Sequence, residues 1–465
     1  TLQRRVRLAK ARHALYQSQP AAAVDLATDA LQSFTRGREM QKADALLLRA
    51  RALQQSGRGR EALDDIGGVL TTLHQRRGSG ESLFGTPELQ DVKDGIDELL
   101  DGDIEVESAL ALTDALAGAI APAATTPRGE VGGDTLCFKV LDSRVRAWWI
   151  TPRGVTERSL PLTRADAVRL VKSVQFAIAG TDRDDARRRL EAAYGALLAP
   201  FRDDITGTAS FRIVADWPLD SVPFSALLDP VTHRFVAEDH AVAFAPAVTG
   251  FRQSVGDRPP DVDLLVVADP RRTYSDDGLV PLRWASKEAD AVSRLYNRTV
   301  VLRGQEATPR ELFRHAPQAR VVHVAAHAIV DRTDGRRSRL LLAGSNGEGD
   351  VFGEELANQK WNAVDVVVLA ACATAEADAR PTSPLTLATQ VLAAGPRFVI
   401  ATLKPIDDRL ASIFFAELHR LLATGVPAPE ALQRAQIHFI EQDRSPMAGD
   451  VGMWSMWTPV AVFSL

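Results

Sequence analysis

The sequence predicts an α/β protein with a doubly wound sheet, preceded by an all-α region. Residues 1–120 are rich in alanine and leucine at helical spacing and show no strand-like run. Residues 121–133 have the Ala, Pro, Thr and Gly composition of a linker. From residue 259 onwards, strand-like and helical stretches alternate, as a parallel sheet with helices on both faces requires. We therefore expect a helical region at 1–120, a linker at 121–133 and two further segments at 134–258 and 259–465.

The helical region contains a faint internal repeat. The motif at residues 13–18 returns about 38 residues later at 51–56, and small residues follow it both times. Small residues inside paired helices are typical of tetratricopeptide (TPR) units. We predict TPR-like hairpins, with a generic helical cap as the alternative, because two units are fewer than a free-standing solenoid needs. Removing 1–120 is then expected to alter activity without destroying the fold of the remainder.

The charge of the helical region suggests a secondary role in binding. Residues 1–65 hold 12 Lys or Arg against 7 Asp or Glu. Such an excess is by default a solvated helix face and only secondarily a surface for an acidic partner. We therefore expect a regulatory protein as a possible partner of this region.

The second segment, 134–258, is expected to begin the α/β part. It opens with a strand-like stretch at 135–150, continues through two helical stretches and reaches another strand at 211–216. These strands are followed by no histidine–cysteine pair. Cys137 lies inside the first strand, where a free cysteine is most simply a small core residue.

The third segment, 259–465, supplies the alternation that defines the fold class. Thr308, Pro309 and Glu311 provide an N-cap, a proline at the first helical position and a capping-box glutamate, which together predict a helix start. The last strand is apolar and is expected at an edge of the sheet. The expected elements are strands at 262–268, 299–302, 321–326, 364–371, 397–403 and 459–463, and helices at 284–296, from 308, 385–394, 409–423 and 429–441.

Composition limits the function classes. The 465-residue chain is long enough for two or three domains, and 45% hydrophobic with 25% charged residues is ordinary for a globular protein. A formal net charge of −5 gives no general reason to bind nucleic acid or an anionic membrane, so neither is expected as a partner. No apolar run of about 18 residues and no signal-peptide pattern occur, so we expect a cytoplasmic protein. Two cysteines are too few for a disulfide framework, which fits a reducing compartment.

His327 and Cys372 follow two of the strand-like runs directly. Side chains at the carboxyl ends of parallel strands face the crevice where open α/β sheets bind their ligands. There an imidazole can take the thiol proton, and the thiolate can attack a carbonyl carbon. The spacing alone leaves other readings open, because a free cysteine is more often a core residue and a histidine after a strand is often a hydrogen-bonded loop residue.

Other chemistry has little support in the sequence. His323 and His327 are four residues apart, but they lack the glutamate of a zinc-binding helix and lie on a strand. We expect His323 to pack or hydrogen-bond within the sheet. The phosphate-binding loop motif and the Gly-x-Ser-x-Gly nucleophile motif are both absent. No metal and no cofactor are therefore expected.

Five motifs lie around the histidine and the cysteine in a specific order. They are HVAAHA at 323–328, SRLLLA at 338–343, VVLAACATA at 367–375, LAAGPRFVIATLKPIDD at 392–408 and EALQRAQ at 430–436. In order and spacing they resemble the CHAT family of caspase-like peptidases that occur with TPR repeats. The resemblance runs from about residue 134 to the C-terminus. It implies a caspase-like fold with an inactive half at 134–258 and an active half at 259–465.

The resemblance implies a role for each site residue. His327 and Cys372 fall on the family's catalytic positions, and the backbone N–H groups of Ala328 and Cys372 fall on its oxyanion hole. Three positions depart from the pattern, because Ala328 and Ala375 replace glycines and Ala373 replaces an acidic residue. Alanine supplies the N–H but does not adopt a positive φ as easily as glycine. The implied function is a cysteine endopeptidase, and the alternative is a non-catalytic TPR–CHAT scaffold. A cysteine acyltransferase or amidase is a third reading.

The resemblance also bears on substrates. In related clan members, including separase, an acidic residue after the strand that follows the cysteine strand contacts a basic P1 side chain, the residue before the scissile bond. The corresponding residues are Asp407 and Asp408. Either could instead cap the helix that begins near residue 409, or one could cap while the other faces the pocket. The family further implies regulated cleavage of a partner protein, such as a pore-forming effector, in prokaryotic stress or antiviral signalling.

Overall fold

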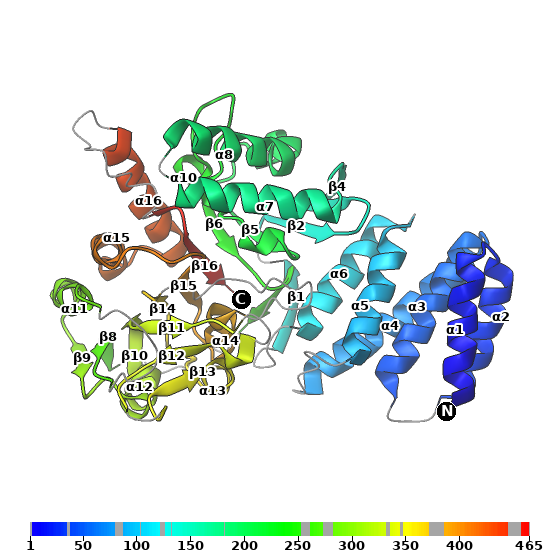
Figure 1. The fold of residues 1–465 in the computed structure, drawn as a ribbon, viewed down its shortest axis with the longest axis horizontal. Coiled ribbons are helices and arrows are strands. Elements are labelled where there is room, and N and C mark those ends of the chain that lie inside the picture. Colours follow the sequence, from blue (N-terminus) through cyan, green and yellow to red (C-terminus); the bar gives the residue numbers. More distant parts are fainter. Residues whose placement is uncertain are drawn as a thin grey trace.

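The structure is a computed structural model of the chain. It describes residues 2–34, 38–79, 87–102, 104–120, 126–131, 133–180, 182–252, 261–272, 282–331, 335–344, 347–371, 386–444 and 457–464. Figure 1 shows a helical region at one end of the molecule and a broad sheet packed with helices at the other. This confirms the predicted fold class, an all-α region followed by a doubly wound α/β sheet. Among the helices in these ranges, none is long and apolar enough to cross a lipid bilayer.

The N-terminal region is helical throughout its described part. Small residues at the helix contacts are fully buried, including Ala11, Ala23, Ala27 and Ala43, so the helices approach closely. Each helix packs on the one that follows it or on the next but one, as stacked hairpins do. The TPR assignment stays a prediction. The helices are α1 (Leu2–Tyr16), α2 (Pro20–Leu31), α3 (Glu39–Gln55), α4 (Gly59–Ser79), α5 (Pro87–Leu100) and α6 (Val106–Ile120).

The two later segments build one continuous sheet. Within the described residues its eleven strands lie in the spatial order β4 (Gly154–Leu160), β3 (Val145–Thr151), β2 (Thr135–Val140), β5 (Ser210–Ala215), β6 (Ala241–Phe244), β16 (Val460–Ser464), β15 (Phe398–Thr402), β14 (Val366–Leu369), β10 (Ala319–Ala325), β8 (Val262–Pro270) and β9 (Thr299–Gly304). Neighbouring strands are parallel except at β2–β3, β3–β4 and β15–β16. The segment 134–258 supplies β2 to β6, and 259–465 supplies the other strands.

Strand β16 differs from the expectation. The sequence suggested an edge strand, whereas β16 lies in the interior of the sheet, antiparallel to β15 and parallel to β6. All its residues are buried, which an interior strand requires on both faces. The last strand of the chain therefore joins the two halves of the sheet.

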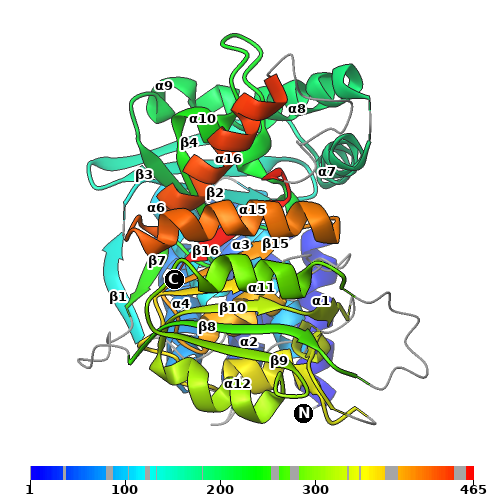
Figure 2. The ribbon, with the colours of Figure 1, turned by 90° about the vertical axis from the view of Figure 1, so that its left-hand side faces the viewer.

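Helices cover the sheet and position its loops. Figure 2 shows α11 and α15 side by side over the half of the sheet that contains β8 and β10. The predicted helix start is confirmed, because the Thr308 side chain accepts a hydrogen bond from the backbone N–H of Glu311. The helices are α7 (Arg164–Ala179), α8 (Arg183–Leu197), α9 (Arg202–Ile205), α10 (Val236–Asp239), α11 (Ala285–Ser293), α12 (Pro309–His315), α13 (Gly353–Ala357), α14 (Leu387–Ala393), α15 (Asp408–Ala423) and α16 (Ala428–Arg444).

The helical region and the sheet share a hydrophobic core. Cys137, Trp148, Ile150 and Val214, on strands β2, β3 and β5, are buried in the same cluster as the leucines and alanines of α1 to α6. The expected core position of Cys137 is confirmed. Because removal of residues 1–120 would expose this apolar face, the structure favours loss of the fold over the mild effect expected from the sequence.

Part of the expected linker is a strand. Residues Thr126–Val131 form β1, which pairs antiparallel with β7 (Thr249–Arg252). Proline and glycine suggested a linker, but both residues are tolerated in a short strand at the edge of a sheet. Backbone pairing does not require apolar side chains, so the sequence pattern did not indicate this strand. Residues 121–125 lie outside the described part of the chain.

Candidate active site

A small cavity lies at the carboxyl ends of the parallel strands β10, β14 and β15. Its volume is about 60 Å³. The location agrees with the general rule that open α/β sheets bind ligands beyond the carboxyl ends of their strands. The walls are mainly apolar and contain two carboxylates, one from α11 and one from α15. The lining residues are Leu282, Ala285, Glu288, Ala325, Ala326, Ala370, Ala371, Thr402, Ile406, Asp408, Ala411 and Phe415.

His327 lies directly after this cavity in the chain. Strand β10 ends at Ala325, and His327 begins the short strand β11 (His327–Ile329), which pairs antiparallel with β12 (Arg339–Leu341). The pairing continues to β13 (Asp350–Phe352). The histidine is half-buried. Strand pairing therefore fixes the backbone of His327. The sequence predicted a strand that ends directly before His327, whereas β10 ends two residues before it.

Ala328, the predicted oxyanion-hole residue, also belongs to β11. Its backbone is extended and lies opposite Leu340 in the register of β11 and β12. Alanine adopts an extended backbone without strain, so the replacement of the family's glycine has no conformational cost in this conformation. Whether its N–H acts in an oxyanion hole stays a prediction.

Cys372 lies outside the described residues, as do Ala373 and Ala375. The residue before it, Ala371, lines the cavity, and its carbonyl oxygen accepts a hydrogen bond of 2.9 Å from the Thr402 hydroxyl of strand β15. This bond fixes the end of the chain segment that leads to the cysteine. The dyad and the contribution of Cys372 to the oxyanion hole therefore stay predictions.

The two aspartates of the predicted specificity motif have different environments. Asp407 is exposed and is the N-cap of α15, because its carboxylate accepts hydrogen bonds from the backbone N–H groups of Arg409 (3.0 Å) and Leu410 (3.1 Å). The capping alternative is thereby confirmed for Asp407. Asp408 is half-buried, lines the cavity and accepts a 2.8 Å hydrogen bond from the backbone N–H of Trp284. Its role towards substrate stays a prediction.

A second carboxylate in the cavity belongs to Glu288, which the sequence analysis missed. Glu288 is only 3% exposed, and its Oε1 atom lies 3.0 Å from Nε2 of the fully buried His323. The chain of contacts continues from His323 Nδ1 to His419 Nε2 at 3.0 Å and from His419 Nδ1 to the Tyr296 hydroxyl at 2.9 Å. Burial and the adjacent His323 lower the pKa of His419 well below its usual value, so this imidazole is neutral at pH 7. The expected buried, hydrogen-bonded role of His323 is confirmed.

A sequence signal for Glu288 did exist. Ala285, Ala289 and Val292 are buried on one face of α11, and Glu288 falls on the same face at helical spacing. A carboxylate on the apolar face of a helix needs a partner or a ligand. Its proximity to the strand ends could not be inferred without the tertiary packing of α11.

A comparison with protein families decides the classification. The model of the CHAT domain matches residues 187–461, which is more than half of the chain. The chain belongs to the CHAT domain family. The match begins inside α8, so strands β2 to β4, which complete the same sheet, precede it. A search of the curated proteins finds no match.

Solved structures show the fold of this CHAT protein. A crystal structure of the Saccharomyces cerevisiae separase–securin complex matches with 9% identity and a TM-score of 0.51, over 96% of this chain and 38% of the other. A second crystal structure of that complex gives 10% identity and a TM-score of 0.52, over 96% and 37%. The Arg-specific cysteine proteinase gingipain R matches at 9% identity with a TM-score of 0.38, over 73% and 78%. The predicted caspase-like fold is confirmed, and this chain spans about 38% of the length of the separase chain.

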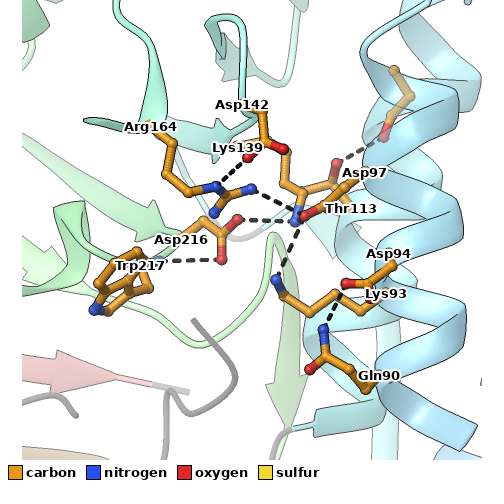
Figure 3. A network of polar contacts seen from close by, with 11 residues as sticks. Gln90, Lys93, Asp94, Asp97, Thr113, Lys139, Asp142, Arg164, Asp216 and Trp217 are labelled. Atoms are coloured by element: carbon orange, nitrogen blue, oxygen red, sulfur yellow. Dashed lines mark hydrogen bonds and ion pairs between the residues drawn. The ribbon is translucent and has the colours of Figure 1, made fainter. Parts of the chain in front are cut away.

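In the first half of the sheet, the carboxyl ends of the parallel strands are covered by the helical region. Figure 3 shows Lys139 of β2 between Asp97 of α5 and Asp216, which follows β5. The lysine Nζ lies 2.7 Å from Asp97 Oδ1 and 2.9 Å from Asp216 Oδ2. Lys93 and Arg164 also contact Asp97, at 3.5 and 3.3 Å. In the other half of the sheet, the corresponding strand ends border the cavity.

Proposed function

We propose that the chain is a cysteine endopeptidase in which His327 and Cys372 form a catalytic dyad. The observation that carries the proposal is that Ala326 and Ala371, the residues directly before them, line one cavity. Strands β10 and β14 are hydrogen-bonded neighbours, and neighbouring strands lie about 4.8 Å apart. We therefore expect an imidazole and a thiol that follow these strand ends to come within reach of each other.

The proposed chemistry follows from these groups. The His327 imidazole takes the proton of the Cys372 thiol, and the thiolate attacks the carbonyl carbon of the scissile bond. Backbone N–H groups of Ala328 and Cys372 donate hydrogen bonds to the resulting oxyanion. The imidazolium then gives its proton to the leaving amine, and a water molecule hydrolyses the thioester. The overall reaction consumes one water and cleaves one peptide bond.

The cavity supports a basic P1 side chain. Asp408 and Glu288 bring two carboxylates to a site that is otherwise mainly apolar, where a cation is attracted more strongly than in water. A volume of about 60 Å³ leaves room for about four water positions at roughly 15 Å³ each, so the site is open to a polar group. We therefore assign the cavity to substrate recognition, with Asp408 as the main determinant and Asp407 as the helix cap.

Substitutions of these acids provide the first prediction. Asp408→Asn is expected to lower kcat/KM for peptides with Lys or Arg at P1 by about 30- to 1,000-fold, because a partly desolvated charge pair is worth about 2–4 kcal/mol when one partner is removed. Glu288→Gln should also lower kcat/KM for these peptides. The measurement is the rate at which each purified variant cleaves the members of a peptide library that differ only at P1.

The matched control is Asp407→Ala. Loss of an N-cap is expected to cost about 1 kcal/mol of stability, seen in the melting curve, while P1 preference stays unchanged. An unaltered preference in both Asp408→Asn and Glu288→Gln would remove the acidic-pocket assignment and leave a neutral or apolar P1.

The biological setting is proposed from the family and the fold. The separase in the similar crystal structures is in complex with a protein, securin, which supports a protein as partner or substrate here. We propose regulated cleavage of a partner protein, such as a pore-forming effector, in cytoplasmic stress or antiviral signalling of a prokaryote. The proposed organisation is a TPR-like region at 1–120 that receives a regulatory protein, a connecting segment at 121–133 that contains strand β1, an inactive half at 134–258 and a peptidase half at 259–465.

Thiol labelling separates the peptidase from the alternative, a non-catalytic scaffold. A dyad that lowers the thiol pKa towards 7 raises the thiolate fraction at pH 7 about tenfold over an unperturbed cysteine. Iodoacetamide should therefore modify Cys372 about tenfold faster in the folded chain than in denaturant, and His327→Ala should remove that difference.

Cys137 provides the internal control for labelling. It is fully buried, and burial raises the pKa of its thiol, so Cys372→Ala should leave the folded chain almost unlabelled. Equal rates for Cys372 in folded and denatured protein would favour the scaffold.

A further inference from the structure

A second, larger cavity lies in the half of the sheet formed by residues 134–258. Its volume is about 470 Å³, and small-molecule sites typically measure roughly 300–1,000 Å³. It is bordered by α8, α9, α10 and the segments that lead into β5 and β6, so we call it the α10 cavity. Figure 2 shows α8, α9 and α10 together, at the opposite end of the sheet from α11 and α12. Among the described residues, none lines both this cavity and the small cavity near His327.

Aromatic rings form much of the wall of the α10 cavity. Tyr194 belongs to α8, Phe211 belongs to β5, and Phe235 and His240 flank α10. Contacts within the protein hold these rings in place. The Phe211 ring packs edge-on against His240 with 5.6 Å between ring centroids, and Phe235 packs in the same way against Trp457 at 5.1 Å. Rings that are already ordered favour a planar aromatic ligand, because little conformational entropy is lost when it stacks on them.

The charged groups of the α10 cavity cancel one another. Arg202 Nη2 lies 2.7 Å from Asp229 Oδ1, and Arg234 Nη2 lies 2.8 Å from Asp239 Oδ1. Burial and the charge of Asp229 raise the pKa of Tyr194 to about 12, so its hydroxyl keeps its proton at pH 7. A charged ligand would lose hydration here without gaining an unpaired counter-ion. The cavity therefore favours an uncharged molecule.

The polar groups that remain available to a ligand are mainly acceptors. His240 Nδ1 lies 2.6 Å from the carbonyl oxygen of Thr208, which can only accept, so Nδ1 carries the proton and Nε2 of the neutral imidazole is an acceptor. Among the described residues, this Nε2 has no hydrogen-bond partner. The Thr206 hydroxyl donates to the Arg202 carbonyl oxygen at 2.7 Å, so it can only accept from a ligand. These groups suit a ligand that donates hydrogen bonds.

We propose that the α10 cavity binds an uncharged aromatic small molecule that carries N–H or O–H donors. Indoles, phenols and nucleobases have this chemistry. The site is separate from the small cavity assigned to substrate recognition, and the proposal does not depend on the catalytic dyad.

A peptide segment is the alternative occupant, because the strand directions place both cavities at one edge of the sheet. Strand β6 is parallel to β16, and β16 is antiparallel to β15, so β6 begins at the edge where β15 ends. Strands β5 and β6, however, each have a strand neighbour on both sides. They therefore offer no open backbone edge to an extended peptide, and a small molecule fits better.

Calorimetric titration of the full chain at pH 8, where an unperturbed imidazole is neutral, tests the proposal. The probes are indole-3-acetamide, which is uncharged, indole-3-acetate, an anion, and tryptamine, a cation, and all three share one ring system. Indole-3-acetamide should bind with a Kd of about 1 mM or below, as expected for a ligand of this size, and both charged probes at least about tenfold more weakly. The N-methylated form of indole-3-acetamide lacks the ring N–H and should bind about three- to tenfold more weakly.

Two variants test the location of binding. Thr206→Trp places a large ring at the exposed mouth of the cavity and should weaken the binding of indole-3-acetamide at least about tenfold. His240→Asn keeps a donor for the Thr208 carbonyl group but removes the Nε2 acceptor, so it should weaken this binding about three- to tenfold. The matched control is Phe176→Ala, which removes a 64% exposed ring outside the cavity and should bind as the wild type does. Melting curves show that each variant is folded.

Equal affinity for the uncharged and charged probes, or wild-type affinity in both cavity variants, would overturn the proposal. So would the absence of saturable binding of indole-3-acetamide up to about 5 mM. The capped tripeptide acetyl-Gly-Trp-Gly-amide is the probe for the alternative, and tighter binding of this peptide than of indole-3-acetamide would assign the cavity to a peptide segment instead. Peptidase activity is not the readout, so failure here is distinguishable from failure of the catalytic proposal.

Discussion

Cys372→Ala and His327→Ala are each expected to lower the rate of peptide-bond cleavage by at least about 10⁴-fold. The nucleophile and its base act as a unit, so removal of either leaves only the contribution of the oxyanion hole and substrate binding. The double variant should therefore be no slower than the single variants. The measurement is single-turnover cleavage of a peptide with lysine at P1, followed by mass spectrometry.

Stability distinguishes this catalytic role from a structural one. His327 is half-buried in the short strand β11, so its truncation should change the free energy of unfolding by less than about 1 kcal/mol. Cys137→Ala and the exposed His438→Ala are the matched controls and should retain cleavage. Retained cleavage in Cys372→Ala would exclude the dyad. A large loss of stability in both catalytic variants would favour a structural role for the two residues.

The sheet could be predicted because parallel strands are buried on both faces. The strands β8, β10 and β14 are apolar runs with few polar residues. Stretches with helical spacing alternate with such runs along the chain, and this alternation predicts an α/β fold. The polar side chains that end such runs are then expected at one edge of the sheet. The structure confirms this expectation for Ala326 and Ala371, which line the cavity at the carboxyl ends of the strands. The prediction succeeds because it depends only on local sequence patterns.

The remaining features depend on pairings between distant residues. The sequence of β16 is apolar on both faces, but only the tertiary structure shows that it lies between β6 and β15. Glu288 is visible as an acid on an apolar helix face, yet its cavity is formed by strand ends that come later in the chain. Likewise, the apolar outer face of β2 and β3 did not indicate that α1 to α6 would cover it. The local preference of a segment for helix or strand does not determine which distant segment it packs against.

The junction between the helical region and the sheet should be among the most sensitive sites for stability. Lys139 is 2% exposed and lies between Asp97 and Asp216 (Figure 3). Burial alone would raise the pKa of Asp97, but the charges of Lys139, Lys93 and Arg164 outweigh it and hold that pKa below its usual value. Lys139→Ala removes the central cation and leaves two largely buried carboxylates without it, which typically costs about 3–5 kcal/mol.

The pH dependence of this loss identifies its cause. In the wild type, the lowered pKa of Asp97 contributes stability that is present above its unfolded value, near 3.8, and is lost as the pH falls through the folded value. In Lys139→Ala the pKa of Asp97 should instead rise above the unfolded value, because burial then outweighs the remaining cations, so the folded variant binds more protons than the unfolded chain and loses stability as the pH rises. Denaturant unfolding at pH 5 and pH 8 should therefore show the larger deficit at pH 8.

Two further variants separate lost charge from lost packing. Lys172→Ala removes an exposed lysine of α7 and should change stability by less than about 0.5 kcal/mol. Lys139→Met/Asp97→Leu replaces the ion pair with apolar groups and should recover part of the loss, because the buried carboxylate that lacked its cation is gone. A deficit in Lys139→Ala that is equal at both pH values and is not reduced in the double variant would show that packing, and not charge, holds helix α5 against the sheet.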